Sequence, residues 1–303
     1  MKLFSARETP GQNIAFLAFA TGINAVISLI ASFLPLSSLF LMFVIPLTSA
    51  FVAYYCKLRY CPVYLIASGA ICIVASTWDI ASAIFYAIPG LFIGYLYGIL
   101  IKNRYTSSLV LFLCSLLQLG FFYASVAIIN AILSIDMQHA LLSLIGLGEK
   151  EGANIGFPLF AYGFSLAEIS LTHLFIHLQI DRFGIEESKK LPWLAPAATV
   201  LFAGVAIIMA FFFPPIALVS TGLSMYWGIM SIIELVRERK NYVFIILGAL
   251  MIAGFLLYAA LYRQAALYGG VALLSFLPLM AGLSQGINLI LLRRTPKEPK
   301  IEP

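Results

Sequence analysis

The chain has 303 residues, of which 62% are hydrophobic and only 10% are charged. An ordinary soluble domain is about 45–50% apolar and about 25% charged. So few charges cannot cover a water-facing surface, which excludes a soluble globule, and the high apolar content excludes a disordered chain. Because a membrane helix needs roughly 20 apolar residues, the composition predicts an all-α, polytopic helical membrane protein with little chain left for a soluble domain.

Apolar runs separated by charged clusters and by Pro or Gly predict about ten transmembrane helices, within a range of about 8–10. The runs are Asn13–Leu34, Ser37–Tyr55, Cys61–Thr77, Ile80–Ile101, Ser107–Ile135, Phe157–Gln179, Trp193–Phe213, Ile216–Val236, Tyr242–Leu261 and Ala265–Leu292. The first run follows Lys2 and Arg7 and is longer than the apolar core of a signal peptide, so we expect an uncleaved first span.

The basic residues test this division through the positive-inside rule. With the N-terminus inside, the inner segments hold Lys2, Arg7, Lys57, Arg59, Lys102, Arg104, Arg182, Lys189, Lys190, Arg237, Arg239, Lys240, Arg293, Arg294, Lys297 and Lys300. Only Lys150 and Arg263 fall outside. The rule therefore predicts an even number of spans, with both termini cytoplasmic, in the cell (inner, cytoplasmic) membrane. Topology explains the net charge of +5, so we expect the lipid bilayer and no nucleic acid as a partner.

The longest inner loop divides the chain into three parts. We expect a six-helix membrane domain at 1–180, a cytoplasmic loop at 181–192 and a four-helix membrane domain with a short basic tail at 193–303. The longest outer loop, 136–156, contains an apolar stretch that suits the outer membrane interface.

Small residues recur at spacing four in three of the predicted spans, and such spacing lets two helix backbones approach closely. The doubled pattern in the fourth span is the strongest, and its contact is either internal or with another subunit. The candidate helix-packing residues are Ala18, Gly22, Gly90, Gly94, Gly98, Gly282 and Gly286.

Glu168 lies near the middle of the sixth predicted span. A carboxylate at that depth is expensive, and by default it marks a functional site. The alternative is a protonated side chain that hydrogen-bonds to Ser165 or Thr172 in its own helix.

His173, His177 and Asp181 share one face of the same helix, at spacing four. Two histidines and a carboxylate can bind a divalent metal or relay protons. They also suit the inner end of a helix, where polar side chains reach water. There is no HExxH motif and no second helix with metal ligands, so these three are weak candidates and we expect neither a metal nor a cofactor.

Polar and aromatic residues gather at the predicted outer ends of the first five spans, as in the mouth of a ligand site. The set is Ser37, Ser38, Trp78, Asp79, Tyr123, Asn130 and Asp136. From it we take Asp79, Asn130 and Asp136, together with Glu168, as predicted ligand contacts. Tyr and Trp at such positions also serve simply as membrane-interface anchors. The chain has no P-loop, no GxSxG motif and no Ser–His–Asp pattern, so we expect no enzyme and no ATPase of its own.

Two long segments carry a resemblance to known families. They read NIAFLAFATGINAVISLIASFLPLSSLFLMFVIPLTSAFVAYYCKLRYCPVYLIASGA and IPGLFIGYLYGILIKNR, and later pieces are STGLSMYWGIMSIIELVRERK and GLSQGINLILLRR. Together they resemble the YybS-like family of bacterial multi-pass membrane proteins. The first six spans also look like the S components of energy-coupling-factor transporters.

The S-component resemblance implies a six-helix fold that captures a small-molecule substrate from outside. It also implies docking onto a transmembrane coupling subunit through small residues of the first span, here Ala18 and Gly22. We therefore expect a transporter-like binding and uptake component. The alternatives are a scaffold or assembly factor that holds a partner through its glycine-faced helices, and an intramembrane enzyme or ion carrier built on Glu168, His173 and His177.

Overall fold

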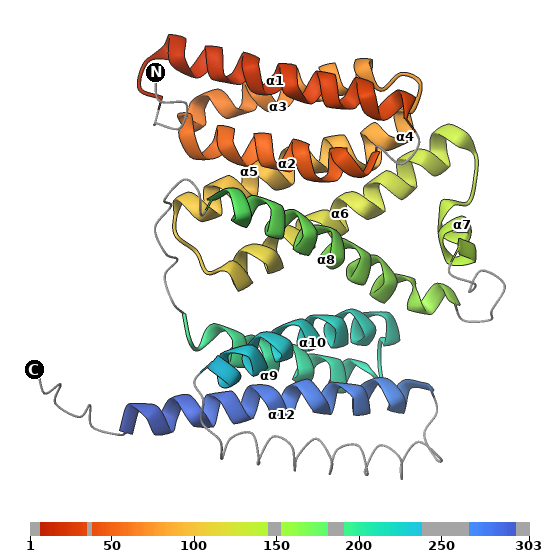
Figure 1. Ribbon diagram of the computed structural model, residues 1–303. Helices are drawn as coiled ribbons and strands as arrows, with labels where there is room; N and C mark the ends of the chain where they lie inside the picture. The colour runs from red at the N-terminus through yellow and green to blue at the C-terminus, as the bar shows by residue number, and fades with distance from the viewer. Residues whose placement is uncertain (1–6, 35–37, 145–152, 181–190, 238–266, 295–303) are drawn as a thin grey trace, which may run out of the picture. The chain divides into compact units, whose positions relative to one another are not determined.

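The computed structural model describes residues 7–34, 38–144, 153–180, 191–237 and 267–294 (Figure 1). Every regular element in these ranges is a helix, with no strand among them, which confirms the all-α prediction. The chain divides into two compact units, residues 1–149 with 161–190 and residues 150–160 with 191–303. The expected loop at 181–192 lies almost entirely outside the described residues, so the predicted domain boundary stays a prediction.

Unit 1 is a bundle of helices with short turns between most of them (Figure 1). Its elements are α1 (Pro10–Phe33), α2 (Ser38–Tyr55), the 3₁₀ turn η1 (Leu58–Tyr60), α3 (Cys61–Ala75), α4 (Ile80–Ser82), the π-helical segment η2 (Ala83–Ala87), α5 (Ile88–Lys102), α6 (Ser107–Leu133), α7 (Met137–Leu144) and most of α8 (Ala153–Ile180).

Helix α1 buries polar side chains and exposes apolar ones. Asn13 and Asn24 are fully buried, whereas Phe19 is 58% exposed and Phe33 is 62% exposed. Water would favour the opposite arrangement, and hydrocarbon favours this one. The first span therefore presents its outer face to lipid.

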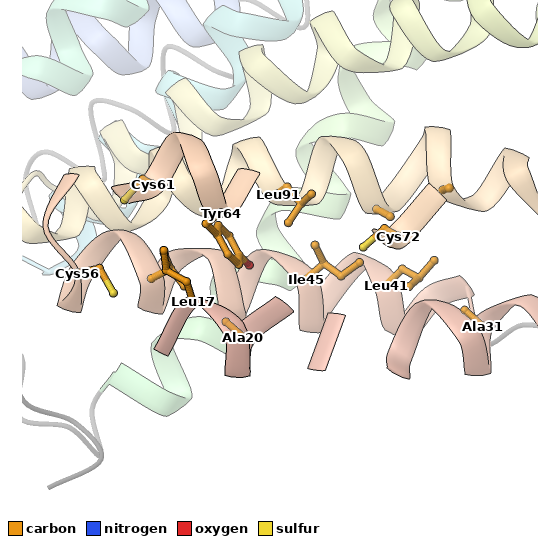
Figure 2. Packing of buried hydrophobic residues seen from close by; sticks show 13 residues of the cluster. Leu17, Ala20, Ala31, Leu41, Ile45, Cys56, Cys61, Tyr64, Cys72 and Leu91 are labelled. Atoms are coloured by element: carbon orange, nitrogen blue, oxygen red, sulfur yellow. The ribbon is translucent and has the colours of Figure 1, made fainter. Parts of the chain in front are cut away.

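The buried polar stripe of α1 is satisfied by a hydrogen-bond network with α2 and α3. Asn24 Nδ2 donates to the Tyr64 hydroxyl at 2.8 Å, and Thr48 Oγ1 donates to Asn24 Oδ1 at 2.6 Å. Thr21 and Ser68 hydroxyls meet at 2.9 Å. Figure 2 shows the apolar core beside this network, where Leu17 and Tyr64 lie among the side chains of neighbouring helices. Interhelical hydrogen bonds of this kind contribute about 0.6 kcal/mol each in membranes, so the network specifies which helices pair as much as it stabilises them.

Helices α2 and α5 meet along a seam of glycines. A Cβ added at Gly94 would lie 2.2 Å from the carbonyl oxygen of Pro46, and one at Gly98 would lie 2.4 Å from that of Ala50. A Cβ added at Gly90 would lie 3.1 Å from Cδ of the Pro46 ring. Backbones this close leave no room for side chains. The glycine pattern of the fourth predicted span thus makes an internal contact.

Two prolines leave backbone carbonyls without their helical donors, and hydroxyls from other helices replace the donors. Pro46 has no N–H for the carbonyl of Met42, and Thr172 Oγ1 donates to that oxygen at 3.1 Å. In η2, the N–H of Ile88 bonds to Ala83 in π register, which deprives Ile84 of its usual donor. The next residue, Pro89, has none to offer, and Ser125 Oγ donates to the Ile84 carbonyl at 2.9 Å. These bonds tie α8 to α2 and α6 to η2.

Unit 2 contains α9 (Leu194–Met209), α10 (Pro214–Arg237) and α12 (Leu267–Arg294), which pack on one another. A Cβ at Gly282 would lie 2.8 Å from Thr199 Cβ, and one at Gly228 would lie 2.9 Å from Pro278 Cβ. Hydroxyl pairs also join the helices, Thr199 with Ser231 at 3.3 Å and Thr221 with Ser275 at 2.8 Å. Small and hydroxylated residues thus let these three helices pack closely.

Six helical stretches in the described part of the chain are long and apolar enough to cross a membrane. They are Pro10–Phe33, Leu58–Ala75, Ile80–Lys102, Ser107–Ile132, Phe157–Ile176 and Pro214–Ile232. Three apolar helices are shorter, at Leu41–Tyr55, Leu194–Met209 and Leu274–Ile290. The predicted span Tyr242–Leu261 lies outside the described residues. The structure thus supports a multi-pass membrane protein, and the count of ten spans stays a prediction.

We predict that Gly94→Ala destabilises the protein by about 1–3 kcal/mol, because the new methyl group overlaps the Pro46 carbonyl. The matched control is Gly120→Ala in α6, where no atom lies within 4 Å of the added Cβ. Thermal unfolding of both purified variants in detergent measures the difference. Equal melting temperatures for the two would contradict the seam.

We predict that Thr172→Val costs about 1 kcal/mol, since it removes the only described donor to the Met42 carbonyl. In a Pro46→Ala background this cost should shrink, because alanine restores the backbone N–H that proline lacks. A double-mutant cycle of unfolding free energies measures the coupling. Ser170→Ala is the control, as that hydroxyl is exposed and bonds within its own helix. Equal costs in the two backgrounds would show that the carbonyl needs no donor.

Candidate functional site

Glu168 lies on the buried face of α8, about midway along the stretch Phe157–Ile176. Its side chain is only 6% exposed, and Ser165 and Thr172, also buried, flank it on the same helix face. The spacing of buried residues along α8 is that of a helix with one inward stripe. A single carboxylate therefore lies deep within unit 1.

The hydrogen-bond partner of Glu168 is Gln118, from the middle of α6. Gln118 is 2% exposed, and its Nε2 donates to Oε2 of Glu168. The other polar atom of this amide, Oε1, is buried without a hydrogen-bond partner. Ser165 instead donates to the Ala161 carbonyl, and Thr172 to that of Met42. The carboxylate thus pairs across two helices rather than within its own.

Two aromatic residues lie one helical turn along the chain from the members of the Glu168–Gln118 pair. Phe164 precedes Glu168 by one turn and Phe122 follows Gln118 by one turn, and their ring centroids are 5.6 Å apart. Tyr86 of η2 interacts electrostatically with Glu168. Among the described residues, no basic side chain offsets the carboxylate. The pair therefore combines one acid, one orphaned acceptor and aromatic surfaces.

His173 makes a separate polar contact on another side of α8. Its Nδ1 hydrogen-bonds to the Tyr97 hydroxyl of α5, and the two rings lie 5.6 Å apart. The side chain of His177 and all of Asp181 lie outside the described residues. In the described part of the chain no three His, Cys, Asp or Glu side chains are grouped for a metal ion. The observed role of His173 is to join α8 to α5.

The three predicted ligand residues at the outer ends cap helices. Asp79 Oδ1 accepts from the backbone N–H of Ser82 at 3.2 Å, at the start of α4. At the α6–α7 corner, Asn130 Oδ1 accepts from Met137 N at 2.9 Å and Asp136 Oδ1 accepts from His139 N at 3.0 Å. Such caps satisfy backbone donors at helix starts. The structure joins Asn130 and Asp136 at one corner and gives Asp79 a separate helix start, so each has a structural task.

The remaining small-residue candidates face open space within the chain. Ala18 and Gly22 lie on the exposed face of α1, and nothing comes within 4 Å of a Cβ added at Gly22 or at Gly286. Their predicted role in packing against a partner therefore stays a prediction, whereas Gly282 and the α5 glycines contact this chain's own helices.

All four cysteines, at 56, 61, 72 and 114, are buried free thiols. Burial raises the pKa of the Cys56 thiol to about 11, helped by the neighbouring Cys61. At neutral pH this side chain is therefore protonated and a poor nucleophile. Cys56 therefore behaves as a small buried hydrophobe.

Sequence reasoning missed Gln118 and Tyr97. Both lie in apolar runs, and Gln118 occupies mid-span just as Glu168 does. An uncharged amide in an apolar run is the signal that could have found it, because amides in membranes pair with other polar groups. Tyr97 offered no such signal, since tyrosine is common at membrane interfaces.

Comparisons with protein-family models, curated proteins and solved structures return no match for this chain. The resemblance to the YybS-like family and to S components therefore stays an expectation that rests on the segments quoted above.

We predict opposite stability effects for the two members of the polar pair. Glu168→Gln should unfold at the same or a higher temperature, because the new amide oxygen still accepts from Gln118 and no acid remains to be neutralised. Gln118→Leu should cost about 1–3 kcal/mol, because it leaves a buried carboxyl without its donor. Thermal unfolding in detergent measures both. A loss in Glu168→Gln as large as that in Gln118→Leu would show that the acid is structural.

Proposed function

We propose that the protein is a transporter-like component of the bacterial cytoplasmic membrane that binds a small molecule inside unit 1. It has about ten spans with both termini cytoplasmic, in accord with the distribution of basic residues. It has no ATPase and no catalytic activity of its own, so an energy-supplying coupling subunit has to come from another chain. The expected resemblance to S components points the same way.

The Glu168–Gln118 pair is the observation that carries this proposal. Stability alone does not favour such a pair, because burying a carboxylate costs more than one hydrogen bond returns. The orphaned Oε1 of Gln118 adds a second cost. Groups that destabilise a fold and persist in its interior are typical of binding sites. This reason for expecting a binding site does not apply to Asp79, Asn130 and Asp136, which cap helices.

The scaffold alternative depends on glycine faces open to a partner. Gly90, Gly94, Gly98 and Gly282 are in contact with helices of this chain, so they are not free to hold another one. The exposed face of α1 that carries Ala18 and Gly22 remains available to such a partner, and it is equally available to a coupling subunit. The uptake proposal accounts for both this face and the interior pair.

The test is a thermal-shift survey of the purified full chain in detergent against vitamins, nucleobases, amino acids, amines and metal ions. A ligand at about 100 times its Kd should stabilise the folded state by about 2.7 kcal/mol. Gln118→Leu should lose the response, and Ser170→Ala, altered on the exposed face of α8, should keep it. If no compound raises the melting temperature of the wild type, or if both variants respond alike, the proposal of an interior binding site is wrong.

A further inference from the structure

The interior pair is rich in acceptors and poor in donors. Glu168 has two carboxylate oxygens, and among described residues only Gln118 Nε2 donates to them. Gln118 Oε1 accepts nothing. A ligand that suits this site therefore supplies hydrogen-bond donors to these acceptor oxygens.

The carboxylate also needs a counter-charge. An ionised acid buried among apolar helices is expensive unless a proton or a cation neutralises it. No described basic side chain does so. When the proton leaves, no described side chain supplies a positive charge, and a cationic ligand can.

The side chains available at the site indicate how large the positive charge of the bound molecule is. Divalent cations are usually held by several carboxylates, imidazoles or thiolates, and no group of three such side chains occurs in the described ranges. One acid balances one positive charge. Phe122 and Phe164, each one helical turn from a member of the pair, form an aromatic pair, and aromatic rings attract an organic cation.

We infer that the buried pair Glu168 and Gln118 binds a small organic molecule through a singly charged ammonium group. The ammonium donates to the Glu168 carboxylate and to Gln118 Oε1, and the aromatic rings contact its carbon atoms. Binding displaces the proton of Glu168 to solvent, so proton and cation compete for one carboxylate. This inference rests on the proposed binding role of unit 1 and specifies its ligand.

Few other titrating groups face this site, so the competition is simple to assign. The π-segment brings Tyr86, with Asp79 beyond it, and α8 itself brings Tyr162 and His173. Helix α6 brings Cys114, one turn from Gln118, and the described side chains of α2 include no titratable group before Tyr54. The carboxyl of Glu168 and the imidazole of His173 belong to side-chain types that ordinarily change charge between about pH 4 and pH 7.5. His173 is bonded to Tyr97 on another helix.

The experiment compares matched probes on the purified full chain: n-butylammonium, n-butanol, butyrate, Na⁺ and K⁺. We expect butylammonium alone to raise the melting temperature, with an affinity that falls as the pH is lowered from about 7.5 to about 5.5. Glu168→Gln should weaken it by at least about tenfold, the usual size of a lost charge-assisted bond. Glu8→Gln, which removes an exposed carboxylate ahead of α1, should leave it unchanged, and Gln118→Leu should weaken it.

Each contrary result has a distinct meaning. Stabilisation by butanol or butyrate, or an undiminished response in Glu168→Gln, overturns the ammonium inference and leaves small-molecule binding intact. An equal response to Na⁺ or K⁺ shows a site for an inorganic ion and overturns the organic ligand. A pH dependence that survives Glu168→Gln places the proton on His173 and overturns the exchange. Silence of every probe here, together with silence in the wider survey, overturns the proposed function as well.

Discussion

Hydrocarbon offers no hydrogen bonds, so every carbonyl that leaves a helix ladder has to find a partner inside the protein. Pro46 and Pro89 create this demand in α2 and at the start of α5. Hydroxyl groups of two other helices supply the missing donors. Thr172 of α8 donates to the Met42 carbonyl, and Ser125 of α6 donates to the Ile84 carbonyl. The same Pro46 presents its carbonyl to Gly94. One proline therefore shapes both the tight α2–α5 seam and the attachment of α8, and the rest of unit 1 is arranged around these contacts.

The two kinds of contact have different consequences. Glycine seams bring backbones together, and any bulk inserted there overlaps backbone atoms. Helix α8 instead meets its neighbours through side chains, Glu168 with Gln118, His173 with Tyr97 and Phe43 with Phe175. Side-chain contacts change partners at a lower free-energy cost than close backbone contacts do, because rotamers change while the helices stay in place. A site that must admit a ligand therefore fits the surface between α6 and α8 better than the α2–α5 seam.

The sequence predicts elements here more readily than it predicts pairings. Apolar runs and charged breaks indicate the helices well, so Ser107–Ile135 closely matches α6, which ends at Leu133. Pro89 indicates in the sequence that one backbone donor is missing, but the α6 hydroxyl that donates to the Ile84 carbonyl is visible only in the structure. Asp136 is of a type that suits both ligand contacts and helix caps, and the cap became visible only with the α7 backbone, while its ligand role stays a prediction. Partners are tertiary facts, which composition and spacing do not encode.

Glu168 differs from most of the other buried polar residues of unit 1. Most of the polar side chains inside unit 1 have a backbone or hydroxyl partner that explains them, as Asn13 does by donating to the Arg7 and Thr9 carbonyls and accepting from Lys57. Glu168 has one donor, and that donor's own oxygen is left over. Asparagine or glutamine at this position would hold α6 and α8 together at lower cost, because neither carries a charge to neutralise. An acid here is therefore best explained by what it does with its charge, because no basic side chain of the described residues offsets it and a proton or an external cation can.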